Sequence, residues 1–140
     1  MIRHRLPNNR WGRTHKVQIG SVEVYITVNR GADGSIREVF GHCTDGFQPY
    51  LEDCCIPSSL ALQYGCLVET LVDKLLHRRG YPPIGAIGQP KSLSDAIGCV
   101  LRADQAMGAP APPPGWAVAP GGLVGPPEGC LEGGKDEDID

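Results

Sequence analysis

The stretch 22–29, Val-Glu-Val-Tyr-Ile-Thr-Val-Asn, decides the fold of this chain of 140 residues. Apolar β-branched residues occupy every second position of it, which is the period of a strand with one buried face. The preceding residues 16–19 alternate in the same way, and Gly20-Ser21 separates the two runs. After the stretch, Asp33-Gly34 is typical of a tight reversal, so that residues 36–43 can return as a partner strand. The sequence therefore predicts a three-stranded antiparallel meander that begins at residue 16.

A helical pattern replaces the two-residue period after Gly46. Four residues share one helical stripe: Leu51, Cys55, Ser58 and Leu62. Pro57 interrupts this stripe, and a proline either kinks a helix or lies in its first turn. We therefore expect a helix from about Pro57 to Tyr64, preceded by an irregular turn.

Two further helices are predicted after Gly65. The first spans residues 67–76 and has an apolar stripe opposite a polar face. Its expected end is the basic run 77–79 followed by Gly80, which suits a helix dipole and a left-handed cap. The last helix is expected to begin after Ser92, because Asp95 three residues later completes a capping box.

These elements predict an α+β domain, in which a three-stranded antiparallel sheet is followed by three helices packed on one of its faces. We place this domain at residues 16–107, after a basic N-terminal arm of residues 1–15. The chain has 19 Gly and 13 Pro, which are concentrated from Gly108 onward. Residues 108–140 bury too little apolar surface to offset chain entropy, so we expect a disordered, acidic C-terminal tail there.

Six cysteines could suggest a secreted disulfide scaffold, but the N-terminal residues indicate a reducing compartment. The formal net charge is −3, which gives no sign of direct nucleic-acid binding. No apolar signal segment follows Met1, so we expect a cytoplasmic protein whose six cysteines are reduced and mostly act as small buried residues. A redox role for the adjacent Cys54 and Cys55 stays open. No apolar run approaches the roughly 20 residues that span a bilayer, so no membrane contact is expected.

The densest group of ligand-binding residue types lies before and within the predicted first strand. Guanidinium groups hold phosphate bidentately, and aromatic rings stack on bases. The candidate phosphate- or nucleotide-binding residues are Arg5, Arg10, Trp11, Arg13, Thr14, His15, Lys16 and Tyr25. The alternative is a solvated arm whose arginines pair with acids elsewhere in the protein. The histidines and cysteines lack metal-site spacing, and we predict no catalytic residue and no metal ligand.

Eight short blocks of the chain occur in a characteristic order. They are Arg5-Leu6-Pro7, Thr14-His15-Lys16, Tyr25-Ile26-Thr27-Val28, Asp33-Gly34, Glu38-Val39-Phe40, Ser59–Gly65, Leu71–Leu75 and Ser92–Asp95. Over residues 5–103 the chain resembles the TSCPD domain, which is found near the C-terminus of adenosylcobalamin-dependent (class II) ribonucleotide reductases and as short stand-alone proteins.

The resemblance implies a module related to ribonucleoside-diphosphate reductase, accessory or regulatory in deoxyribonucleotide synthesis, with a reductase subunit as partner. A chain of 140 residues is too short for the catalytic barrel of such an enzyme, so no catalytic residue carries over. No cofactor is expected in this chain, and adenosylcobalamin would belong to a larger reductase partner.

Two other functions stay open at this point. The basic arm would suit a free-standing binder of a nucleotide or nucleotide-derived signal. An apolar stripe at Leu67, Leu71 and Leu75 would suit a structural domain that shares this face with a second copy, and we expect a homo-oligomer.

Overall fold

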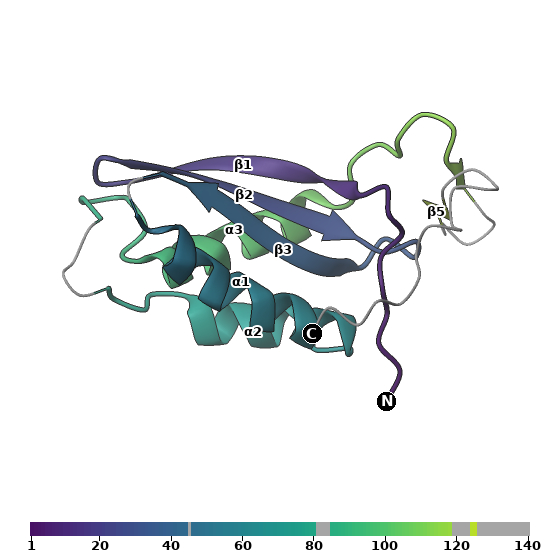
Figure 1. Ribbon diagram of the computed structural model, residues 1–140, viewed down its shortest axis with the longest axis horizontal. Coiled ribbons are helices and arrows are strands. Elements are labelled where there is room, and N and C mark those ends of the chain that lie inside the picture. Colours follow the sequence, from purple (N-terminus) through teal and green to yellow (C-terminus); the bar gives the residue numbers. More distant parts are fainter. Residues whose placement is uncertain (45, 81–84, 119–123, 126–140) are drawn as a thin grey trace.

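The computed structural model describes residues 1–44, 46–80, 85–118 and 124–125 (Figure 1). Its main elements are β1 (Trp11–Ile19), β2 (Val22–Arg30), β3 (Ile36–Cys43), α1 (Gln48–Gln63), α2 (Val68–Leu75) and α3 (Leu93–Met107). Two short strands, β4 (Ala117–Val118) and β5 (Val124–Gly125), pair with each other after α3. The predicted α+β fold, three strands followed by three helices, is confirmed.

The three long strands form an antiparallel meander in the order β1-β2-β3. Side chains at alternate positions of β2 are buried, from Val22 to Val28, whereas Tyr25 between them is exposed. One face of the sheet therefore packs on the helices and the other lies open. The largest fully buried apolar side chains of the core are Ile19, Ile26, Leu51, Leu62, Ile97 and Leu101.

β1 begins at Trp11 and not at the predicted Lys16. Its register pairs Trp11 with Arg30 and Ile19 with Val22, so the whole strand lies along β2. The inward positions of the additional segment hold Trp11, Arg13 and His15, so the apolar alternation stops while the strand continues. The last five residues of the predicted arm thus belong to the sheet.

α1 begins at Gln48, nine residues before the predicted start at Pro57. The expected stripe is confirmed on both sides of the proline, since Leu51 and Leu62 are fully buried. Pro57 has no N–H to donate to the carbonyl of Asp53. Burial of the apolar stripe outweighs this loss, so the helix continues through the proline, and the predicted start is wrong.

Side chains of α1 close the outer edge of β3. Ser59 Oγ accepts the Val39 N–H at 3.0 Å and donates to the Val39 carbonyl at 2.8 Å. Gln48 accepts the Cys43 N–H at 2.8 Å and donates to the Gly41 carbonyl at 3.0 Å. These backbone groups on the edge of β3 are therefore bonded within the domain and are not free to pair with another strand.

α2 ends at Leu75, before the basic residues that were expected to close it. His77 has a positive φ of 63°, which is rare for a residue other than glycine. The predicted ending at Gly80 is therefore wrong. Along the predicted oligomer stripe, Leu71 and Leu75 pack against the core, whereas Leu67 is 67% exposed.

Buried Asp95 explains the conformation of the α2–α3 connection. It accepts the His77 N–H at 2.7 Å and the Lys91 N–H at 2.8 Å. Burial opposes ionisation of Asp95, but these two backbone donors outweigh it and hold its pKa below the usual value. The predicted N-cap of α3 is confirmed, because Ser92 Oγ accepts the Asp95 N–H at 3.0 Å. The Asp95 carboxylate bonds the N–H groups of His77 and Lys91 and not that of Ser92, so the predicted capping box is only half formed.

The segment after α3 runs over the end of the sheet at which β1 begins (Figure 1). Trp11 Nε1 donates to the carbonyl oxygens of Pro110 at 3.1 Å and Ala111 at 3.3 Å. The rings of Trp11 and Trp116 lie 6.1 Å apart between centroids. These contacts involve residues 108–118 of the segment predicted to be disordered, and residues 119–123 and 126–140 lie outside the described residues.

Candidate functional site

The carboxylate of Asp104, which is fully buried in the last turns of α3, contacts basic side chains of two strands. Its Oδ1 accepts a hydrogen bond from Arg30 Nη2 at 2.6 Å. Its Oδ2 lies 2.8 Å from His15 Nε2 and 3.3 Å from Arg13 Nη1. One carboxylate thus joins β1 and β2 to α3.

Strand register brings the basic partners of Asp104 to the inner face. Arg13 and His15 lie opposite Val28 and Ile26 of β2, whose side chains are buried. Arg30 continues the inward series of β2 by one more position, after Val28. Side chains along a strand point alternately to its two faces, so each of these basic side chains points toward the helices.

Both arginines also bond the C-terminal carbonyls of α3. Arg30 Nη2 donates to the Asp104 carbonyl at 2.9 Å, and Arg13 Nη1 donates to the Gly108 carbonyl at 3.1 Å. Cations at this end of a helix are favoured by its dipole. The carboxylate is enclosed by its donors and shielded from solvent, so the group fixes the position of α3 on the sheet and is not accessible to a substrate.

Three other predicted site residues lie on the open face of the sheet. Thr14 and Thr27 bond through their hydroxyl groups at 2.7 Å. Lys16 lies opposite Tyr25, and its Nζ is 3.3 Å from Glu23. The hydrogen bond and charge of Glu23 raise the pKa of Lys16. Lys16 and Tyr25 are therefore neighbours on a surface that solvent reaches.

The last two predicted residues belong to the arm. Arg10 Nε donates to Glu38 at 3.0 Å, and its Nη1 donates to the Pro7 carbonyl. Arg5 lines a small cavity of about 260 Å³ with Arg37 and the turn after β2. The eight predicted residues are thus divided among the inner face, the open face and the arm, and the structure does not bring them into one site.

Asp104 and Arg30 were not among the predicted site residues, although the sequence pattern places each of them at a buried position. Asp104 follows Val100 by four positions and Leu101 by three, so it lies on the buried stripe of its helix. Arg30 extends the two-residue period of Val24, Ile26 and Val28. A charged residue on each of two buried stripes indicates that the two meet in the core.

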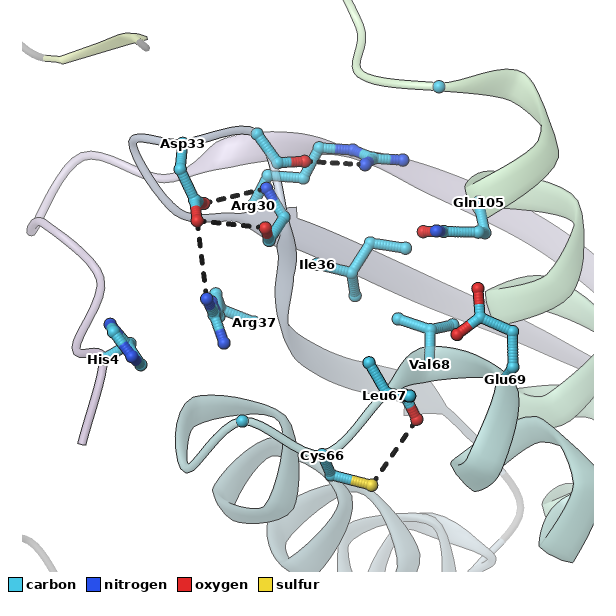
Figure 2. Close-up of a pocket in the computed structure, with 14 residues that line it drawn as sticks. His4, Arg30, Asp33, Ile36, Arg37, Cys66, Leu67, Val68, Glu69 and Gln105 are labelled. Carbon is cyan, nitrogen blue, oxygen red and sulfur yellow. Dashed lines mark hydrogen bonds and ion pairs between the residues drawn. The ribbon is translucent and has the colours of Figure 1, made fainter. Parts of the chain in front are cut away.

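A cavity of about 570 Å³ adjoins this cluster (Figure 2). Its walls come from the turn between β2 and β3, the connection between α1 and α2, the first turn of α2 and the end of α3. Arg30 and Gln105 border it from the sheet and from α3, and Val68 and Glu69 border it from α2. The cavity is therefore lined by both charged and apolar groups.

A family model of the TSCPD domain matches residues 2–105 of the chain. The chain belongs to the TSCPD domain family. Its relatives include the vitamin B12-dependent ribonucleotide reductase of Agrobacterium fabrum, 30% identical over 97 residues, which are 67% of this chain and 8% of that protein. The enzyme of the same name from Streptantibioticus cattleyicolor is 34% identical over 95 residues, or 64% of this chain and 15% of that protein. No solved structure matches the chain.

This TSCPD domain thus spans only a small part of the curated relatives that it matches. The match ends at residue 105, so it includes β1, β2, β3, α1, α2, most of α3 and the Asp104 contacts made by Arg13, His15 and Arg30. The two reductases named above match 97 and 95 residues of this chain.

Two cysteines of the TSCPD domain have a raised pKa. Desolvation raises the pKa of Cys55 to about 12, and burial together with Asp95 raises the pKa of Cys99. Both thiols are therefore protonated at neutral pH. Within the same residues no group of histidine, cysteine and acidic side chains is placed to hold a metal ion, and no helix is long and apolar enough to cross a membrane.

Proposed function

We propose that this TSCPD chain acts in the cytoplasm as an accessory or regulatory partner of a ribonucleotide reductase, in deoxyribonucleotide synthesis. The observation that carries the proposal is the match of residues 2–105 to a domain that vitamin B12-dependent reductases also contain. The continuous core and the closed edge of β3 support a segment that is stable as a separate unit. In this proposal adenosylcobalamin is bound by the reductase and not by this chain.

An apolar groove between β3 and α1 is the surface that we assign to the reductase. It has a volume of about 830 Å³ and is lined by Phe40, Leu60 and Ile56. Phe40 is 48% and Ile56 is 60% exposed, which leaves apolar area open to solvent. Adjacent exposed apolar side chains are typical of protein–protein contact surfaces.

Affinity purification of the tagged full chain from its own cells tests this proposal. We expect the reductase to be recovered with the chain, and less of it with Ile56→Glu. Tyr50→Glu is the matched control, because Tyr50 is a 66% exposed apolar residue of the same helix that does not line the groove. Absence of the reductase from the purified material would contradict the proposal. The expected homo-oligomeric state is checked by a mass measurement of the purified chain in solution.

A second candidate function is binding of a nucleotide on the open face of the sheet. The observation that favours it is the pairing of Lys16 with Tyr25 across β1 and β2, with exposed Phe40 on the same face, opposite Thr27. A cationic group can contact phosphate while an aromatic ring stacks on a base. Of the predicted residues, Lys16, Tyr25 and Thr14 are the ones that the strands place together on this face.

A thermal-shift screen against nucleotides and cyclic dinucleotides tests the second candidate. A ligand that binds only the folded state raises the melting temperature with concentration. We expect Tyr25→Ala to abolish the response, and Tyr50→Ala, which removes an exposed tyrosine of α1, to retain it. A flat response across the whole panel would exclude this function.

A further inference from the structure

We infer that the outer edge of β1 pairs with the β1 strand of a second copy of this chain, in antiparallel orientation, so that the two sheets join into one. Figure 1 shows β1 along one margin of the sheet, with β2 on its other side. This surface consists of backbone hydrogen-bonding groups, unlike the apolar groove and the open sheet face described above. The inference names the surface of the expected homo-oligomer and does not depend on association with a reductase.

Alternate residues of β1 turn their backbone groups away from the sheet. Gly20-Ser21 is a two-residue turn, and the residues on either side of it, Ile19 and Val22, exchange hydrogen bonds in a hairpin of this kind. From Ile19 backwards, every second residue bonds β2, and the residues between them point their N–H and C=O groups outward. The outward residues, all of them exposed, are Gly12, Thr14, Lys16 and Gln18.

The opposite edge of the sheet supports this alternation and shows how the two edges differ. On β3 the same alternation turns Val39 and Cys43 outward, and their N–H groups are bonded by Ser59 and Gln48 of α1. Within the described residues, no backbone or side-chain group bonds the outward N–H and C=O groups of β1. The sheet therefore has one closed edge and one edge that can accept a further strand.

β1 lacks the features that commonly prevent a strand edge from pairing. Natural edges are interrupted by proline, by a bulge or by charged side chains. β1 contains no proline, and its register with β2 runs without a shift along the whole strand. Its charged side chains are already paired within the chain, Lys16 with Glu23 and both Arg13 and His15 with Asp104. A second strand therefore meets little uncompensated charge at this edge.

A second copy satisfies this edge better than a foreign strand does. Its β1 presents the same outward groups, so one association about a two-fold axis bonds the edges of both copies. Hydrogen bonds across the edge can form only between outward residues. An axis at His15 pairs Thr14 of each copy with Lys16 of the other. It also pairs Gly12 with Gln18, and it aligns the strands over their whole length.

Charge selects this register over its neighbours. An axis at position 16 would place Lys16 opposite Lys16 of the second copy, and an axis at position 14 would place the basic side chains Arg13 and His15 opposite each other. Like charges directly opposite each other destabilise a strand pair. With the axis at His15, Lys16 lies opposite the neutral Thr14, and Arg13 lies opposite Val17. The ring of His15 is then turned to the buried carboxylate of its own chain.

Sedimentation equilibrium of the purified full chain over a range of concentrations tests the inference. We expect a dimer that dissociates on dilution. Thr14→Pro removes an outward N–H and leaves the hydrogen bonds between β1 and β2 in place, so circular dichroism should show an intact fold. Its dimer should be at least about fivefold weaker, because a bond is lost on each side of the axis. A strict monomer for wild type, or an unweakened dimer for folded Thr14→Pro, overturns the inference.

Charge variants at Thr14 test the register through opposite effects. Because Lys16 of the second copy lies opposite, Thr14→Glu should tighten the dimer about two- to thirtyfold, and Thr14→Lys should weaken it by a similar factor. Thr27→Glu and Thr27→Lys are the matched controls. Thr27 bonds the Thr14 hydroxyl on the same face but lies in the central strand, so both controls lose that bond and should leave dimer strength unchanged.

Equal dissociation constants for Thr14→Glu and Thr14→Lys overturn the register, and they overturn the whole inference if Thr14→Pro does not fold. A different occupant has its own outcome. If the purified chain is monomeric and Thr14→Pro no longer recovers a protein that wild type recovers from cells, the edge binds a strand of that protein, which overturns the second copy. Recovery of the reductase should be equal for Thr14→Pro and wild type, because the groove lies at the opposite edge of the sheet.

Discussion

Asp104 joins two strands of the sheet to α3. Its carboxylate is the shared partner of Arg13, His15 and Arg30, and all of these groups are removed from bulk water to a large extent. Burying charges costs several kcal/mol for each ion, and only close pairing compensates for it. The intact cluster therefore adds little net stability, but removal of one member leaves the buried charge of another without a partner.

Replacement of Asp104 by asparagine should destabilise the fold by about 3–5 kcal/mol, because two guanidinium groups would lose their counter-charge inside the protein. Urea unfolding followed by circular dichroism measures the change. Asp73→Asn is the control, since its side chain is 78% exposed and its effect should stay within about 0.5 kcal/mol. Similar stabilities of the two variants would contradict the role assigned to Asp104.

Asp95 should make the stability of the protein depend on pH on the acid side. Its pKa in the folded state lies below the ordinary value of an aspartate, because the N–H groups of Lys91 and His77 favour the charged form despite burial. Its contribution is therefore complete above the unfolded-state pKa, about 4, and is lost as the pH falls through the folded-state pKa.

The free energy of unfolding, measured in urea from pH 7 to pH 2, checks this dependence. Asp95→Asn should be less stable than wild type at pH 7, and the difference should decrease as the pH falls below about 4. A constant difference at every pH would show that Asp95 acts through its shape alone.

Among the elements, those with regular apolar spacing were predictable from the sequence. The alternation in β2 and the stripe of α1 predicted which side chains are buried. β1 was predicted too short because Arg13 and His15 occupy inward positions, and their charges are compensated by a residue about 90 positions later in the chain. Arg13 and His15 were predicted to bind a ligand for the same reason. A local pattern does not show whether a basic residue meets a ligand or a buried acid.

Pro57 misled the prediction of α1 for a different reason. A proline inside a helix costs a hydrogen bond, but it does not exclude a helix whose buried stripe extends on both sides. Pro57→Ala should therefore stabilise the protein by roughly 1–3 kcal/mol, because the Asp53 carbonyl regains a donor. Thermal and urea unfolding measure the gain. Ile56→Ala, at an exposed neighbouring position of α1, is the control, and a Pro57→Ala variant no more stable than wild type would contradict the expectation.

At the scale of the whole molecule, the N-terminal residues and the segment after α3 each contact parts of the domain that are distant in the sequence. The His4 N–H donates to the Gln63 carbonyl at 2.6 Å, and Trp11 contacts the segment after α3 through its ring and its Nε1–H. Trp11 is 4% exposed, so this segment covers a core residue. No local pattern in the Gly- and Pro-rich segment predicted this contact.

Trp11→Phe should loosen the segment after α3, because phenylalanine retains the ring but cannot donate to the carbonyls of Pro110 and Ala111. Loss of this hydrogen bond should accelerate chymotryptic cleavage after Trp116 roughly two- to tenfold. Mass spectrometry of the timed digest identifies the cut. Tyr50→Phe, at an exposed site on α1, should leave the rate unchanged, and equal rates for all three proteins would refute the contact.

Asp104 is synthesised long after the three basic residues that it neutralises. The groups that neutralise each other are separated by 74 residues for Arg30 and 89 for His15. During translation at about 5–20 residues per second, β1 and β2 emerge seconds before their acid partner. Until then Arg13, His15 and Arg30 must stay hydrated, which prevents the inner face of the sheet from closing over them. The N-terminal strands are therefore kept from collapsing prematurely until α3 has been made.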